Sequence, residues 1–470
     1  MEIVSLQFAV FTALVLAAYA LLSRRAQNLW LLAASYIFYL TWGWQFAATL
    51  AGLTIFNYLL GQRILTTKNA RILLWIGIGL NASALLLLKV LIGPYGDSLI
   101  ATLRLPAVTS TLLLPIGFSF YILQAISYLV DLSRTPKLAA ASLADFALYL
   151  AYFPKLLSGP IERPSAFFAQ LAKERQVDNA AFGRGLGLIL IGLLRKVVIS
   201  DQLRLFHPAD LFSKPAEFVF SEKLLGLFVF AFILYNDFAG YSAIVRGVSL
   251  LFGIDLTVNF KQPFFANSFS DFWNRWHISL SAWLRDYIFF PLRRSMVKAK
   301  LPQNLTILLP PMVTMLASGL WHGSYLSMLF WGGLHGLYLV FQEFVLNRLF
   351  PKDKDSLLRQ TLLVAFVFVL TSLAWIPFGA SSLGSAFIYF KSFLPPYYFA
   401  PLPDFFFFDL GFPLFLSLFI DWQEYRINNV DFFIHWKPAL QAGALALALL
   451  LLLLFSVSGT DLSGFVYQGF

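Results

Sequence analysis

The sequence contains no cysteine, and this absence excludes several kinds of chemistry at once. Disulfide bonds, thiolate-bound metal ions and a cysteine nucleophile all need a side chain that the chain lacks. It also has no P-loop pattern and no GxSxG elbow, which argues against ATP hydrolysis and against a soluble-type serine hydrolase. The chain has five histidines, and their spacing does not match the HExxH type of metal motif, so we expect no bound metal. They are His207, His277, His322, His335 and His435.

Charged residues are also scarce, at 12% of the chain, whereas 59% of the residues are hydrophobic. Soluble domains usually carry about 25% charged residues, so this composition indicates an integral membrane protein. A spanning helix needs roughly 20 apolar residues, and the apolar stretches predict about ten to twelve membrane-embedded helices, some of them short or interrupted. No polar stretch is long enough for a soluble core, so we predict one all-helical polytopic membrane domain over residues 1–470.

The distribution of basic residues predicts a topology. Residues 1–22 are followed, not preceded, by Arg24 and Arg25, which differs from a cleaved signal peptide, and we expect a retained helix there. Basic residues then fall in alternate connections, which the positive-inside bias places in the cytoplasm. The net charge of +10 is therefore first a topology signal, with attraction to anionic lipid or an anionic substrate second. Because the basic residues form no contiguous soluble domain, nucleic-acid binding is not expected.

Two stretches do not fit simple spanning helices. The stretch "YFPKLLSGPIERPSAFF", residues 152–168, holds three prolines. Broken backbone at membrane depth is tolerated only where protein or a water-filled cavity supplies the missing hydrogen-bond partners. The second stretch, residues 257–302, is too polar to cross lipid unshielded.

The second stretch contains "SDFWNRWHISLSAWLRDYIFF", residues 270–290. Ser268 followed by Asp271 resembles a capping box and predicts one helix over residues 270–290. Helical spacing then places two sets on neighbouring faces. One set is Phe272, Trp276, Ser279, Trp283 and Tyr287, and the other is Trp273, His277, Ser281, Leu284 and Ile288. Two interpretations stay open: an interfacial helix with tryptophans at headgroup level, or a functional site, since intramembrane ionisable groups are costly.

A third stretch, "ASGLWHGSYLSMLFWGGLHG", covers residues 317–336. His322 lies in the middle of this apolar run between Gly319 and Gly323. Small residues four apart let helices approach closely, and they also leave space beside a reacting group, so packing and catalysis are both open for His322. The same spacing recurs at Gly332 and Gly336 around His335, where the repetition favours a packing role.

Two further clusters carry charge. The stretch "NDFAGYSAIVRG", residues 236–247, contains Asp237 and Arg246. A buried Asp237 must be paired, and we favour a structural Asp–Arg contact slightly over a catalytic role. The stretch "PLRRSMVKAKL", residues 291–301, is either a solvated cytoplasmic loop or a rim that binds phosphate. Its basic residues are Arg293, Arg294, Lys298 and Lys300.

Four motifs together resemble the membrane-bound O-acyltransferase family, and within it the bacterial alginate O-acetyltransferase branch. They are "FPKLLSGPIERP", "NDFAGYS", "FWNRWHISLSAWLRDYIFFPL" and "GLWHG", in this order. The resemblance implies a catalytic core over residues 115–336, with peripheral transmembrane helices in residues 1–114 and 337–470. It also implies a ring of tilted, broken and re-entrant helices around a central tunnel, which links a cytoplasmic acyl-donor entrance to an external acceptor mouth.

The resemblance also assigns roles to residues of this sequence. The family's essential histidine corresponds to His322 and its second polar position to His277. The tunnel-lining helix corresponds to residues 272–290. We expect the tunnel and substrate contacts at Trp273, Trp276, Ser281, Trp283, Arg285, Tyr287, Trp321 and Asp237, and the donor-phosphate rim at Arg293, Arg294, Lys298 and Lys300.

The chemistry of acyl transfer agrees with these roles. A thioester is already activated, so the enzyme must supply a base, stabilise the oxyanion and exclude water. Histidine is the side chain best suited to take a proton near neutral pH, and whether His322 acts as the base or carries the acyl group covalently is open.

We therefore expect transfer of an acyl group, with acetyl favoured, from acetyl-CoA or another cytoplasmic thioester, without a permanently bound cofactor. The final acceptor is expected to be an extracytoplasmic polysaccharide, reached through an SGNH-type, serine-bearing partner protein. The expected location is the bacterial inner membrane, as a multi-pass protein in contact with lipid. One alternative is D-alanyl transfer from a carrier protein to teichoic acid. Another is a transporter or flippase, although no inverted repeat is visible.

Overall fold

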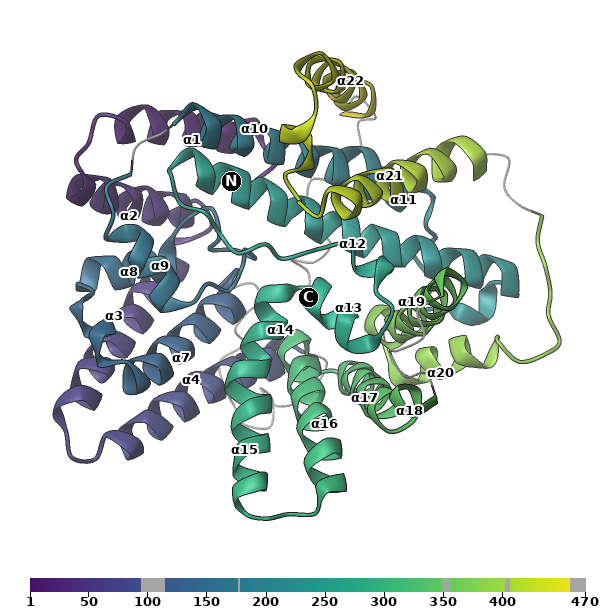
Figure 1. Ribbon diagram of the computed structural model, residues 1–470, viewed down its shortest axis with the longest axis horizontal. Coiled ribbons are helices and arrows are strands. Elements are labelled where there is room, and N and C mark those ends of the chain that lie inside the picture. The colour runs from purple at the N-terminus through teal and green to yellow at the C-terminus, as the bar shows by residue number, and fades with distance from the viewer. Residues whose placement is uncertain (94–114, 176–177, 350–355, 402–405, 457–470) are drawn as a thin grey trace. The chain divides into compact units, whose positions relative to one another are not determined.

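The structure, a computed structural model, describes residues 1–93, 115–175, 178–349, 356–401 and 406–456. Throughout these residues the regular structure is helical, and they contain no β-strand (Figure 1). Six of the described helices are long and apolar enough to cross a membrane. They cover residues 70–91, 220–251, 303–322, 326–349, 357–379 and 438–455. The expectation of an all-helical membrane protein is confirmed.

Large apolar side chains on the outer faces of these helices support a lipid environment. Trp75 is 62% exposed on α4 (Ala70–Ile92), and Leu453 is 64% exposed on α22 (Pro438–Ser456). A soluble protein rarely exposes long contiguous apolar faces, whereas lipid tails solvate them without cost.

The described chain divides into two compact units. The first contains residues 1–193 and 241–258, and the second contains residues 194–240 and 259–456. Helix α12 (Phe220–Leu251) contributes its first part to the second unit and its last part to the first. The functional division into a core over residues 115–336 and peripheral helices stays a prediction.

Two helices of the first unit, α1 (Leu6–Tyr19) and α8 (Leu143–Ala151), begin at serines whose hydroxyl groups pair a free backbone donor. The Ser5 hydroxyl accepts a hydrogen bond from the Phe8 amide at 3.2 Å, and the Ser142 hydroxyl accepts one from Asp145 at 3.1 Å. The elements of this unit, besides its part of α12, are α1 (Leu6–Tyr19), α2 (Arg24–Leu40), α3 (Trp44–Thr66), α4, α7 (Phe118–Arg134), η1 (Pro136–Ala140), α8 (Leu143–Ala151), α9 (Pro164–Leu171) and α10 (Asn179–Leu193).

The proline-containing stretch between α8 and α9 is irregular and buried. Its amides find partners in side chains from other parts of the unit. The Phe153 amide donates to the Ser35 hydroxyl at 3.0 Å, and the Ser158 amide donates to the Tyr241 hydroxyl at 3.0 Å. Protein groups thus supply hydrogen bonds that the interrupted helix cannot make, as expected for broken backbone in a membrane protein.

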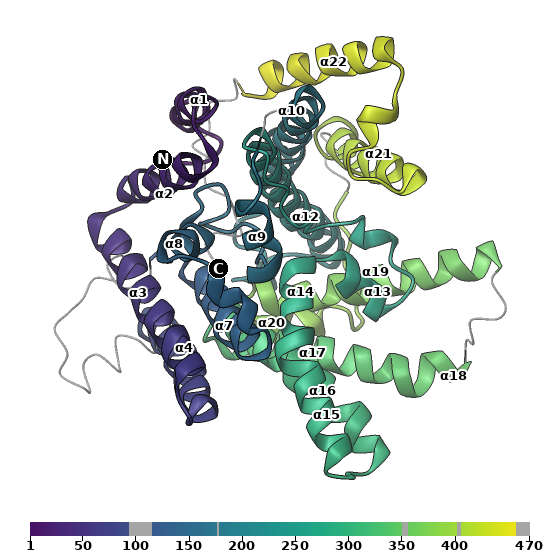
Figure 2. The same ribbon diagram turned by 60° about the vertical axis from the view of Figure 1, so that its left-hand side comes forward.

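The second unit carries the histidine motifs. Besides its part of α12, its elements are η2 (Leu194–Ser200), α11 (Asp201–Phe206), η3 (Pro215–Glu217), η4 (Pro263–Phe265), α13 (Phe269–Arg275), α14 (Ile278–Leu284), η5 (Arg285–Phe289), α15 (Phe290–Lys298), α16 (Gln303–His322), α17 (Leu326–Phe341), η6 (Gln342–Leu346), α18 (Asn347–Leu349), α19 (Leu357–Gly379), α20 (Leu383–Lys391), η7 (Phe406–Gly411), α21 (Phe412–Ile427), η8 (Phe432–His435) and α22. Helices α15 and α16 lie side by side in both views (Figure 1 and Figure 2).

Helices α16 and α17 pack antiparallel at very short range, and glycines make this possible. A Cβ atom added at Gly319 would lie 2.2 Å from the Met328 carbonyl oxygen, and one at Gly332 would lie 2.3 Å from the Met315 carbonyl oxygen. These distances leave no room for any side chain. The glycine spacing around His322 and His335 therefore packs two helices, as one of the two sequence interpretations predicted.

We expect Gly332→Ala to destabilise the protein, because the new methyl group must push α17 away from the α16 backbone. Overpacking of this kind typically costs about 1–3 kcal/mol. The neighbouring substitution Gly333→Ala is a matched control, because a Cβ there would lie 4.0 Å from the Leu316 side chain. The measurement is the thermal midpoint in detergent. Equal midpoints for the two variants would contradict the packing argument.

The prediction of one helix over residues 270–290 is wrong. Helix α13 ends at Arg275, Trp276 and His277 leave the helical path, and α14 begins at Ile278. A π-helical turn, η5, then leads into α15. The predicted faces of a continuous helix therefore do not exist across the break, and His277 is presented from a bend.

Candidate functional site

The site is built around the break between α13 and α14. The Ser268 hydroxyl accepts a hydrogen bond from the Asp271 amide at 3.2 Å, which confirms the predicted helix start. His277 adopts a φ of 41°, in the left-handed region that side-chain-bearing residues seldom occupy. Such a conformation costs about 1–3 kcal/mol and persists only where the surroundings hold it.

The residue that holds the break open is Asn259, which precedes α13 in the chain. Its carbonyl oxygen accepts from the Ile278 amide at 2.9 Å. Its side-chain oxygen accepts from the Ser279 amide at 3.1 Å and from the Ser279 hydroxyl at 2.9 Å. Asn259 therefore pairs the first two amides of α14, as a capping residue does in an ordinary helix, while the His277 carbonyl oxygen accepts from the Ser281 amide at 2.9 Å.

His277 is buried, with 1% of its surface exposed. Its ring lies 4.8 Å from the Phe238 ring and 5.9 Å from the Trp321 indole, measured between centroids. Burial lowers the pKa of His277 to about 3, because the apolar surroundings disfavour the imidazolium ion. The imidazole is therefore neutral at physiological pH.

His322 is the last residue of α16 and is also buried. Its ring lies 4.8 Å from the Trp321 indole, 5.1 Å from Trp331 and 5.3 Å from Phe378. The same Trp321 indole thus contacts the rings of both His277 and His322. Two histidines that are far apart in sequence therefore pack against the same indole ring.

The other predicted tunnel residues fall into different surroundings. Trp276 packs 4.9 Å from Trp375, and Trp273 packs 4.9 Å from His335, so both belong to a buried aromatic cluster next to the two histidines. Trp283 and Tyr287 pack on each other at 5.0 Å.

Three predicted site residues are engaged in local or structural contacts. The Ser281 hydroxyl donates to the Trp276 carbonyl oxygen at 3.1 Å, and the exposed Arg285 donates to the Asn274 side chain at 2.9 Å. The Asp237 carboxylate pairs with Lys196 at 2.9 Å. Arg246 contacts Asp255 at 3.0 Å, and the favoured Asp237–Arg246 contact stays a prediction.

The four basic residues of the predicted rim are exposed on or just after α15, whereas Met296 between them is buried. The Arg294 guanidinium lies over the Phe290 ring at 6.0 Å. Exposure agrees with a role in binding a soluble anion, and the side of the membrane that these residues face stays a prediction. The described residues contain no group of three or more His, Asp and Glu side chains that could bind a metal ion.

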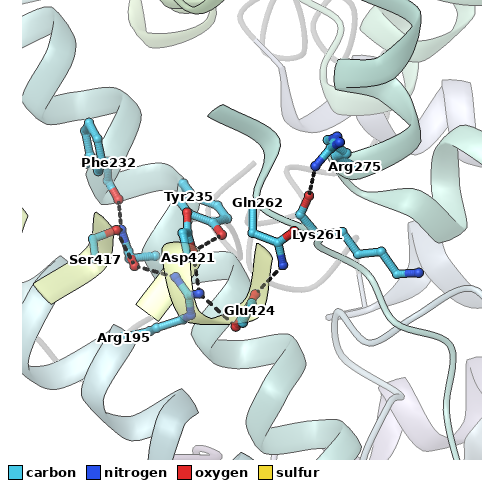
Figure 3. A network of polar contacts seen from close by, with 10 residues as sticks. Arg195, Phe232, Tyr235, Lys261, Gln262, Arg275, Ser417, Asp421 and Glu424 are labelled. Carbon is cyan, nitrogen blue, oxygen red and sulfur yellow. Dashed lines mark hydrogen bonds and ion pairs between the residues drawn. The ribbon is translucent and has the colours of Figure 1, made fainter. Parts of the chain in front are cut away.

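Sequence reasoning missed several residues of this site. Asn259 and Phe378 lie in none of the four motifs, and Phe238 lies in "NDFAGYS" without a predicted role, because the role of each depends on contacts with distant segments. A buried ion network around Arg195, Asp421 and Glu424 was also missed (Figure 3). The sequence could have indicated this network, since charged residues in apolar helices are energetically costly and are usually paired or functional.

Comparison with known proteins places this geometry in a family. A sequence model of the membrane-bound O-acyltransferase family matches residues 127–376, a range that includes all four motifs and both histidines of the site. A protein named "Probable alginate O-acetylase AlgI" from Pseudomonas putida is 35% identical over 385 residues, which cover 79% of this chain and 76% of that protein. A peptidoglycan O-acetyltransferase from Helicobacter pylori is 33% identical over 409 residues, which cover 78% of this chain and 75% of that protein.

A third relative, a teichoic acid D-alanyltransferase from Streptococcus thermophilus, is 30% identical over 255 residues, which cover 53% of this chain and 61% of that protein. All three relatives are named for the transfer of an acyl group, which favours the enzyme over the transporter alternative. Because one family model spans the motifs, the broken helix and both histidines, the chain belongs to the membrane-bound O-acyltransferase family, and the protein is an acyltransferase of a multi-helix membrane fold.

Proposed function

We propose that the protein transfers an acetyl group from a cytoplasmic thioester, with acetyl-CoA as the donor, for O-acetylation of a polysaccharide outside the bacterial inner membrane. The observation that carries the proposal is the meeting of His277 and His322 at the Trp321 indole, at 5.9 and 4.8 Å between ring centroids. The relatives named for alginate and peptidoglycan O-acetylation support a polysaccharide as the final acceptor.

In the proposed reaction His322 is the general base. The oxygen of an acceptor hydroxyl attacks the thioester carbonyl carbon while its proton moves to the imidazole of His322. The tetrahedral intermediate collapses, the carbon–sulfur bond breaks, and the leaving thiolate takes the proton from the His322 imidazolium, which restores the neutral base. The products are an acetyl ester and a free thiol, so atoms and charges balance without a cofactor.

His277 has a different proposed role. Because burial lowers its pKa to about 3, it stays neutral and retains one ring N–H as a hydrogen-bond donor. A neutral donor aimed at the thioester carbonyl stabilises the oxyanion as it forms and does not exchange protons with the reactants. The left-handed backbone of His277 supports this role, since strained conformations cluster at functional sites.

The aromatic surroundings support the exclusion of water. Trp276, Trp331 and Phe378 are all buried near the two histidines. A dry site slows hydrolysis of the thioester and strengthens every hydrogen bond to the reacting carbonyl. We propose that these side chains line a narrow tunnel, which admits only a slender donor arm from one side and a slender acceptor from the other.

The exposed basic residues support a donor entrance. We expect Arg293→Glu and Arg294→Glu each to raise the KM for acetyl-CoA, with a smaller effect on kcat. The reason is that phosphate contacts far from the reacting carbonyl stabilise the bound substrate and the transition state equally. Loss of one charge-assisted contact, worth about 1.5–3 kcal/mol, corresponds to roughly a tenfold or greater change in KM. Steady-state kinetics with the purified protein measures this, and exposed Lys437→Glu serves as the control.

The topology of this rim has its own test. Because the chain has no cysteine, Lys298→Cys introduces a single thiol for labelling. Membrane-impermeant maleimide is expected to react with it only from the cytoplasmic side. Labelling of intact cells from outside would contradict both the topology and the donor role.

Transfer of D-alanine is the second candidate, because the chain is similar to a teichoic acid D-alanyltransferase. The two candidates separate in one experiment with purified protein and two labelled donors. Acetyl-CoA consumption that requires a hydroxyl acceptor supports O-acetylation, whereas turnover with a D-alanyl carrier protein alone supports the second candidate.

A further inference from the structure

A buried ion network lies in the same unit as the two histidines, and no step of the proposed reaction uses it directly. The Arg195 guanidinium, on η2, donates to Asp421 at 2.6 Å and to Glu424 at 3.1 Å, both on α21 (Figure 3). It also donates to Asn236 at 3.0 Å, while the Tyr235 hydroxyl donates to Asp421 at 2.8 Å. All five side chains are buried.

Such a network is not explained by stability alone. Taking charges out of water costs several kcal/mol per ion, and apolar residues of similar volume often stabilise a protein as well or better. Two acidic side chains share one guanidinium here, so this group of three holds one more acidic than basic residue. The burial of this network therefore needs a further explanation, and the hydrogen bond between Glu424 and Gln262 provides one.

That contact leads from Glu424 to Gln262. One carboxylate oxygen of Glu424 accepts from Arg195, and the other accepts from the Gln262 side-chain amide at 2.7 Å (Figure 3). Gln262 has a φ of 43°, so it is also held in the left-handed region. The carboxylate thus anchors a strained residue in a segment between α12 and α13.

The anchored segment is the one that shapes the bend at His277. The Lys261 amide, adjacent to Gln262, donates to the Arg275 carbonyl oxygen at 3.0 Å. The Arg275 guanidinium in turn donates to the Lys261 carbonyl oxygen at 3.5 Å (Figure 3). Asn259, two residues earlier than Lys261, accepts from the backbone on the other side of His277. The segment therefore forms backbone hydrogen bonds with residues both before and after His277.

We infer that Glu424, fixed by Arg195, is a positioning residue for His277, acting through Gln262 and the segment at residues 259–261. This inference rests on the proposed acyl transfer for its effect on rate, whereas the link itself is independent of that function. A donor to an oxyanion must be held to within about 0.5 Å, so loosening the segment lowers the rate of transfer while the donor still binds.

The test is an exchange of the two partner groups. In Glu424→Gln, the amide at position 424 offers one acceptor to two donors, so either the Arg195 or the Gln262 hydrogen bond is lost. In Gln262→Glu, two carboxylates face each other. The double variant Glu424→Gln/Gln262→Glu restores both bonds, because the new carboxylate at position 262 accepts from the new amide at position 424, whose oxygen accepts from Arg195. The surface change Glu343→Gln is a matched carboxylate-to-amide control. Glu343 is exposed, and its carboxylate accepts a hydrogen bond from the Asn347 side chain one helical turn away.

We expect kcat to fall by roughly 10- to 100-fold in each single variant, with the KM for acetyl-CoA changed less than about threefold, because misplacement by about 1 Å can cost 100-fold. The double variant is expected to recover kcat to within about threefold of the parent, and Glu343→Gln to leave it unchanged. A purely structural role would lower the amount of folded protein without this split between kcat and KM and without the reciprocal rescue. A parent-like kcat in folded Glu424→Gln would overturn the inference.

Hydrogen–deuterium exchange of a peptide covering residues 276–284 gives a readout that needs no activity. Exchange at the Ile278 and Ser279 amides is expected to be faster in the single variants and to return to the parent rate in the double variant. If the parent transfers no acetyl group, the proposed function fails, and exchange still decides whether the link exists. Unchanged exchange in all variants overturns the link. Should Glu424→Gln not fold, Gln262→Ala removes the link while leaving the three charges in place, and the same two readouts apply.

Discussion

Replacing His322 by alanine is expected to reduce acyl transfer to background while the protein still folds and inserts into the membrane. The proposed base is then missing, and loss of a general base typically costs roughly 100- to 10 000-fold in rate. His322 is the last residue of α16, so alanine at this position does not interrupt the helix. Turnover of labelled acetyl-CoA by the purified variant measures the effect.

Two further variants make this prediction specific. His322→Gln keeps a polar side chain of similar length without a titratable nitrogen, and it is expected to be as inactive as His322→Ala. His435→Ala removes an exposed histidine outside the site and is expected to retain the parent rate. Substantial turnover by folded His322→Ala would remove this residue from the mechanism.

His277→Ala is expected to impair transfer less completely than His322→Ala. A positioned neutral donor contributes to oxyanion stabilisation, and removal of one such donor typically costs about 100- to 1000-fold in kcat. Because His277 is proposed to exchange no proton, the pH profile of the residual activity should keep the shape of the parent profile. Equal and total loss in both variants would instead indicate that the two histidines act as one coupled unit.

Acetylation of an external polysaccharide is expected to fail entirely unless a separate extracytoplasmic protein is present. No polar stretch of the sequence is long enough to form a domain that binds a polymer, and a bulky chain is not expected to enter the proposed tunnel. A serine on a slender segment of an SGNH-type partner fits the proposed chemistry, because its hydroxyl can reach His322 and then pass the acetyl group to the polymer. The measurement uses the protein in liposomes with acetyl-CoA inside and polymer outside.

Adding the partner to the outer medium is expected to switch polymer acetylation on, whereas a partner with its serine changed to alanine is not. Liposomes that contain the His322→Ala protein provide the matched control for leakage of the donor. Efficient acetylation of the polymer by the parent protein alone would contradict the proposed requirement for a partner protein.

Much of the general character of this protein follows from the sequence. Apolar stretches with few charges require helices in a membrane, because only intrahelical hydrogen bonds satisfy a lipid-facing backbone. Gly319 and Gly332 predicted close helix packing, and the structure places both directly against backbone carbonyl groups. The four motifs in order were enough to identify the family, and the positions of His277 and His322 within them named the candidate site. These features depend on residues that are close in the chain, where spacing alone carries the information.

The bend that presents His277 was decided only by the tertiary structure. Local spacing favours one helix over residues 270–290, and that prediction failed at Trp276 and His277. Leaving the helix there frees backbone donors, which is costly unless partners exist. Asn259 supplies them from 20 positions before Ser279, and Glu424 anchors that segment from 162 positions after Gln262. The choice between a straight helix and a bend therefore depends on long-range hydrogen bonds, which no local sequence pattern contains.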